Sequence, residues 1–192
     1  MRRSGLGLVV VLSLMAACAK WESPQSQAGR LEAGWTGADS GRTGADSGRT
    51  GADSGKISAP AAAEWCADRR LLEIRAIQGE TGLALALYPV DTIVSDSYPV
   101  VEPTRADSAR PSANVALRLF SQTAIEGYQG DSGTVLLERS SSGQLSGSLT
   151  ARARSVPNGE RIRLRGRFER VAVLPQERGC IPEPADTTED AE

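Results

Sequence analysis

Residues 148–168 read SLTARARSVPNGERIRLRGRF, and this stretch decides the fold class. Apolar or small residues alternate with polar ones on both sides of a Pro-Asn-Gly segment, and a period of two is typical of β-strands with unlike faces. Asn-Gly between two alternating runs is the strongest short-range signal of a β-hairpin. With Asn158 and Gly159 as the central turn residues, Arg152 is expected opposite Arg165, with the apolar residues together on the other face.

The same alternation continues outward from this hairpin through residues 71–77, 82–88, 115–120 and 133–138. Residues 133–174 are therefore predicted to form a β-meander. The four prolines between residues 88 and 113 indicate a long connection. About seven antiparallel strands without a long helical pattern predict an all-β domain, and both a β-sandwich and a small barrel fit that pattern.

The N-terminal residues 1–17 have the layout of a secretory signal peptide: two arginines, an apolar run and then small residues. Cysteine follows directly in the sequence MAAC at residues 15–18, which resembles the lipobox of bacterial lipoproteins. The resemblance implies that Cys18 becomes the mature N-terminus and carries acyl chains such as palmitate, which anchor the protein to a membrane of the bacterial cell envelope. Ala19 in place of Asp favours the outer membrane in enterobacterial sorting.

Two cysteines remain after Cys18, and they are Cys66 and Cys180. An even pair in an exported chain predicts a disulfide bond. The bridge would close a loop of about 115 residues, which the chain-entropy description values at about 4–5 kcal/mol. A redox role is disfavoured because the two residues have no Cys-x-x-Cys spacing and no basic context.

Composition divides the rest of the chain. Residues 18–63 are rich in Gly, Ser and Ala and contain three heptads, TGADSGR twice and TGADSGK once, between residues 36 and 56. The heptads carry no large apolar residue, so they fit neither a coiled coil nor a calcium-binding β-roll, and the segment is predicted to be a flexible linker. Residues 64–182 form the predicted β domain. Residues 183–192, with five acids and no base, form a predicted disordered tail.

An arginine-rich face is the strongest functional signal. Residues 139–170 contain eight arginines and two glutamates. Guanidinium groups pair well with phosphate and carboxylate, so this face is a candidate anion-binding site. Its candidate residues are Arg152, Arg154, Arg163, Arg165 and Arg167. A solvated face neutralised by the domain's own acids is the alternative interpretation, and the sequence leaves both open.

Inventory excludes several activities. The chain has no histidine, and both of its lysines lie in the predicted linker, which removes histidine-based triads, histidine metal sites and lysine catalysis from the domain. The acids of the proline-rich connection show no paired arrangement, so we expect no enzyme, cofactor or metal. Nucleic acid is not expected as a partner because the only aromatic residue among the arginines, Phe168, should point inward.

Together these observations predict a lipid-anchored envelope protein whose disulfide-closed β domain acts by binding. The expected partner is an anionic envelope component, namely an anionic lipid, lipopolysaccharide or an acidic protein patch. The alternative is a structural or assembly lipoprotein that docks onto another envelope protein.

Overall fold

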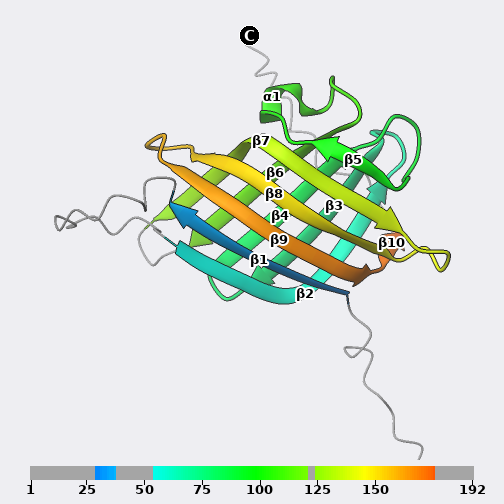
Figure 1. Ribbon diagram of the computed structural model, residues 1–192, viewed down its shortest axis with the longest axis horizontal. Coiled ribbons are helices and arrows are strands. Elements are labelled where there is room, and N and C mark those ends of the chain that lie inside the picture. The colour runs from blue at the N-terminus through cyan, green and yellow to red at the C-terminus, as the bar shows by residue number, and fades with distance from the viewer. Residues whose placement is uncertain (1–28, 38–53, 121–123, 176–192) are drawn as a thin grey trace, which may run out of the picture.

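The computed structural model describes residues 29–37, 54–120 and 124–175, and the structural statements below concern those residues. They form ten strands and one short helix (Figure 1). The elements are β1 (Gly29–Gly37), β2 (Ser54–Cys66), β3 (Leu71–Gln78), β4 (Thr81–Tyr88), β5 (Asp96–Pro99), α1 (Pro103–Ala106), β6 (Ser112–Phe120), β7 (Ile125–Arg139), β8 (Leu145–Ser155), β9 (Arg161–Val171) and β10 (Val173–Pro175).

Eight of these strands close into an antiparallel barrel. The strands neighbour one another in the order β1-β9-β8-β7-β6-β4-β3-β2, and the pairing of β1 with β2 completes the ring. Apart from the inserted β5, this is a simple up-and-down path in which consecutive strands lie side by side (Figure 1). Of the two predicted architectures the barrel is therefore the observed one. It has one strand more than the approximate count from the sequence.

The first two strands correct the predicted linker. β1 and most of β2 fall within residues 18–63, yet they fill the gap between β9 and β3. Their inward residues alternate as Leu31, Ala33 and Trp35 on β1, and as an Ile-Ala-Ala-Ala series on β2. Alanine and glycine dominate these strands, so composition alone suggested a linker. Small side chains nevertheless suit a barrel wall that faces bulky residues from other strands.

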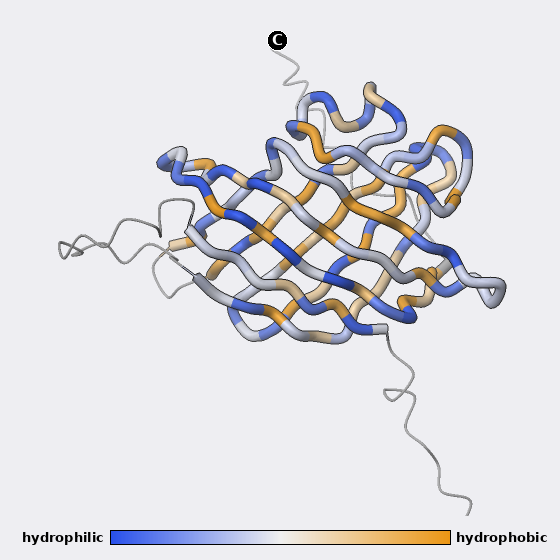
Figure 2. Tube along the Cα trace, in the orientation of Figure 1, coloured by the Kyte–Doolittle hydropathy of each residue, from blue (hydrophilic) through white to orange (hydrophobic). Residues whose placement is uncertain are grey.

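The inward-facing side chains fill the barrel interior. Figure 2 shows hydrophobic and hydrophilic residues alternating along the strands. The largest fully buried side chains are Tyr98, Tyr128 and Phe168. Tyr98 comes from β5, which pairs with the second half of β7. The long connection between β4 and β6 thus contributes to the core, because Ile93 and Val100 are buried in it as well.

The hairpin between β8 and β9 has the predicted faces but a different register. Arg152 lies opposite Arg163, not Arg165, so each pairing is shifted by two residues. A two-residue type I′ turn needs positive φ at both central residues, whereas here Gly159 has φ 75° and Asn158 is not left-handed. The loop is longer: Ser155 N donates to Glu160 O at 2.7 Å, and Asn158 Oδ1 accepts from Glu160 N at 2.9 Å. A shift by two residues preserves every inward and outward assignment.

Several predictions concern residues outside those described. They are the signal peptide, lipidation at Cys18, the heptads between residues 38 and 53, Cys180 and the acidic tail. Cys66 is buried at the end of β2, and β10 runs parallel to β2 so that Pro175 is level with Trp65. Cys180 follows only five residues later in the sequence, so the Cys66–Cys180 bridge stays a prediction that this strand pairing favours. No helix within the described ranges is long and apolar enough to cross a bilayer.

Candidate anion-binding face

All five predicted arginines lie exposed on the outer surface of the barrel. Arg152 and Arg154 project from β8, while Arg163, Arg165 and Arg167 project from β9 at every second residue. Alternate residues of one strand lie about 6.5–7 Å apart, so β9 carries a ladder of cationic side chains. The structure divides these five arginines into two groups according to their partners.

Two of the arginines are neutralised by carboxylates. Arg167 donates from Nη2 to Glu32 Oε2 at 2.9 Å, and its Nε lies 3.7 Å from Glu169 Oε1. This hydrogen bond and the charge of Arg167 hold the pKa of Glu32 below its ordinary value. Arg154 Nη2 lies 4.0 Å from Glu102 Oε1, which belongs to the long connection. For these residues, the interpretation of a face neutralised by its own acids is correct.

The other three arginines have no acidic partner among the residues that the structure describes. Arg152, Arg163 and Arg165 form no ion pair and no side-chain hydrogen bond with any residue that the structure describes. Arg152 on β8 and Arg163 on β9 are directly opposite each other in the pairing of these two strands. Two like charges in such a position destabilise the sheet. An anion bound between these side chains would remove that repulsion.

The unpaired arginines are flanked by hydroxyl and small residues rather than acids. The lateral row through Arg165 continues to Gly34 and Lys56 on one side and to Thr150 on the other. The row through Arg163 has the members Ser54, Thr36, Arg152 and Ser132. No acid occurs in either row, so positive charge accumulates between β2 and β8.

Two open hollows lie on either side of the β9 arginines. One, of about 700 Å³, is lined by Arg163, Arg165 and residues of β1 and β2, including Gly34 and Lys56. The other, of about 610 Å³, is lined by the same two arginines and by Arg152 with parts of β7 and β8. Arg163 and Arg165 therefore stand between two concave surfaces and can reach a ligand in either one.

Lys56, Gly34 and Glu32 belong to this face but were not predicted from the sequence. All three lie in the segment interpreted as a linker, so they had no expected strand position. The alternation of Leu31, Ala33 and Trp35 was the available signal. It covers only five residues beside a repetitive segment, and a short apolar alternation does not by itself identify the strands that flank it.

Other chemistry finds little support in the described ranges. No group of three or more His, Cys, Asp and Glu residues is placed there to hold a metal ion. The acids of the long connection are engaged separately: Asp91 lies 3.6 Å from Arg70, and Glu102 lies beside Arg154.

Comparison of the chain with protein-family models, with curated proteins and with solved structures finds no match for any of the three.

Proposed function

We propose that this protein is a lipid-anchored component of the bacterial cell envelope whose barrel binds an anionic envelope component. The observation that carries the proposal is that the five arginines on the outer face of β8 and β9 differ in whether they have a carboxylate partner. Arg167 and Arg154 have carboxylate partners, whereas Arg152, Arg163 and Arg165 have none within residues 29–37, 54–120 and 124–175, and they line two hollows. Guanidinium groups without internal partners are suited to phosphate or carboxylate groups from outside the chain.

The position of β1 shortens the tether that the sequence suggested. Lipidation at Cys18 would leave residues 19–28, ten in number, before the barrel begins at Gly29. Even fully extended, ten residues span at most about 33–36 Å. The barrel would therefore stay close to the headgroups of its own membrane, and anionic lipid is the nearest class of partner.

We propose binding rather than catalysis as the role of the face. Among the described residues it combines guanidinium, ammonium and hydroxyl groups, and the carboxylate of Glu32, in the row of the sheet next to Arg165, is already held by Arg167. Of the described aromatic residues near the face, Trp35 and Phe168 are both buried, so neither offers an exposed ring on which bases could stack. Nucleic acid is accordingly not part of the proposal.

The test measures binding of residues 19–192 to phosphatidylglycerol vesicles and phosphatidylcholine vesicles over a salt series. We expect binding to the anionic vesicles only, weakening as salt rises because exposed charges are screened. Changing Arg152, Arg163 and Arg165 together to Gln should remove it. The matched control changes Arg69, Arg105 and Arg118, which are exposed arginines outside this face, and should retain most of the binding. Equal binding by both triple variants would contradict the proposal.

An exposed apolar end of the barrel favours a second candidate, docking onto another envelope protein. Ile77, Phe120, Ile125 and Val156 are 71%, 40%, 64% and 63% exposed. They cluster at the end that holds the β3–β4 and β8–β9 turns, since Phe120 pairs with Ile125 and Val156 N donates to Gly127 O. Docking through this end would be insensitive to salt, which separates the two candidates.

A further inference from the structure

We propose that the space above Gly34, between Lys56 and Arg165, is a seat for one phosphate group. The inference deepens the proposed anion binding and rests on it. It assigns the anion a defined position on β1 and adds Lys56 and Gly34 to the binding residues. The neighbouring row of the sheet has a similar arrangement and already holds an oxyanion that belongs to the chain.

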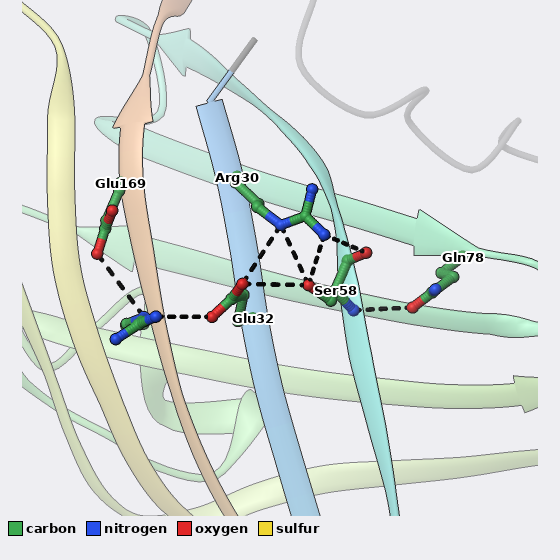
Figure 3. Close-up of polar contacts among 6 residues, drawn as sticks. Arg30, Glu32, Ser58, Gln78 and Glu169 are labelled. Atoms are coloured by element: carbon green, nitrogen blue, oxygen red, sulfur yellow. Dashed lines mark hydrogen bonds and ion pairs between the residues drawn. The ribbon is translucent and has the colours of Figure 1, made fainter.

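That internal oxyanion is the carboxylate of Glu32. Figure 3 shows it with Arg30 and Ser58 on one side; on the other is the unlabelled β9 side chain that contacts both Glu32 and Glu169, which is Arg167. Glu32 Oε2 accepts from Arg167 Nη2 at 2.9 Å. Glu32 Oε1 lies 3.3 Å from Arg30 Nε and accepts from Ser58 Oγ at 3.3 Å. A carboxylate on the middle strand β1 is thus held by donors from both flanking strands.

The next row repeats this geometry without the carboxylate. Gly34 takes the place of Glu32 on β1, Arg165 takes the place of Arg167 on β9, and Lys56 takes the place of Ser58 on β2. Cations stand on both flanking strands, but the middle strand has no side chain between them. An external oxyanion above Gly34 would occupy the position that corresponds to the Glu32 carboxylate.

The space over Gly34 is open. A Cβ built on Gly34 would meet only Gly55 O, at an ordinary contact distance of 3.6 Å. The hollow of about 700 Å³ that Lys56, Arg163 and Arg165 line includes Gly34 and Thr36. Since adjacent strands are about 4.8 Å apart, the backbones of β2 and β9 are about 9.6 Å apart here. Two long cationic side chains can therefore converge on one small anion between them.

Charge and donor directions select phosphate over a single carboxylate. Three cations, Lys56, Arg163 and Arg165, line the hollow, and none of the described residues that line it is an acid. The donors approach from β2, from β9 and, through the Thr36 hydroxyl, along β1. The oxygens of a phosphate group are arranged tetrahedrally, so they can accept from donors in several directions, whereas a carboxylate has two oxygens in one plane. Free phosphate carries up to about two negative charges and a lipid phosphodiester carries one.

The experiment uses the full chain with Cys18→Ser in a neutral detergent and measures binding by isothermal titration. The probes are inorganic phosphate and dihexanoyl phosphatidylglycerol below its micelle concentration, with dihexanoyl phosphatidylcholine as the zwitterionic control. The central variant is Gly34→Glu. It places a carboxylate of the chain itself in the proposed seat, as Glu32 does in the neighbouring row. Gly34→Ala is the matched control because the hollow accepts a Cβ at that position.

We expect Gly34→Glu to lower the affinity for both phosphate probes at least 100-fold, with a thermal midpoint equal to or above that of the parent chain. Lys56→Gln should lower it about tenfold, the usual effect of losing one charge-assisted hydrogen bond. Gly34→Ala should stay within threefold of the parent. Tighter binding of the phosphatidylglycerol probe identifies a lipid headgroup as the source of the phosphate, and equal binding identifies a free phosphate group.

The two proposals fail in different ways. If the triple arginine variant loses binding while Gly34→Glu and Lys56→Gln bind as the parent does, the seat is wrong and the arginine face stands. If the parent chain binds neither probe nor anionic vesicles, the proposed function itself is overturned. A well-folded Gly34→Glu protein that keeps parental affinity is the outcome that removes the seat.

Discussion

Leu31 offers the most direct test of the barrel's first strand, because its segment reads as a linker from composition. Its side chain is 2% exposed and lies between Ala59 on β2 and Phe168 on β9. Leu31→Ala would remove three carbon atoms from this contact. Ala59 is too small to fill the space, and the ring of Phe168 lies against Gly147 of the neighbouring strand β8, so we expect a loss of about 3 kcal/mol in the free energy of unfolding. That corresponds to a fall of roughly 10 °C in the thermal midpoint.

Urea unfolding followed by circular dichroism and by tryptophan fluorescence measures this loss, with the urea dependence of the free energy expected to stay constant. Leu136→Ala is the control. It is the same substitution on the outer surface of β7, at a side chain that is 48% exposed. The control should lose no more than about 0.5 kcal/mol. Equal and small losses for both variants would refute the placement of β1 in the cooperative core. A fragment that begins at residue 64 should likewise fail to fold, because it lacks β1 and nearly all of β2.

Three further predictions concern charge and backbone conformation. Arg152→Gln should raise the free energy of unfolding by about 0.2–1 kcal/mol at low salt, because it removes the repulsion with Arg163. This gain should become smaller as salt rises. A loss of stability would show that Arg152 has a stabilising partner. Because the native pKa of Glu32 is lowered, its carboxylate stabilises the fold above its ordinary pKa of 4.5 and this contribution disappears as pH falls through the native value. The stability difference between the parent chain and Glu32→Gln should therefore be constant at neutral pH and diminish below about pH 4.5 in urea titrations, and a difference independent of pH would rule out the ion pair. Arg170 has φ 54°, so Arg170→Gly should raise stability by up to about 1 kcal/mol in the same assay, whereas glycine at a strand arginine with negative φ should lower it.

The sequence placed the candidate arginines on the correct face of the sheet but did not show which of them have partners within the chain. Parity along β8 and β9 placed all five arginines on the outer surface, because alternate side chains of a strand must point to opposite faces. Parity could not say which arginines find a carboxylate. Arg167 meets Glu32 and Arg154 lies near Glu102, and both acids are distant in sequence and come from segments without a predicted strand position.

The β class, the two faces of the final hairpin and the inward position of Phe168 could be predicted from the sequence, because they follow from the period of two and from turn chemistry between neighbours in the chain. Closure of the sheet could not, since it depends on β1 pairing with both β2 and β9, and β9 is distant from β1 in the sequence. The same pairing sets Gly34 between Lys56 and Arg165. Cross-strand register places residues side by side that share no local pattern, and it depends on the energy of the whole barrel rather than on any one segment.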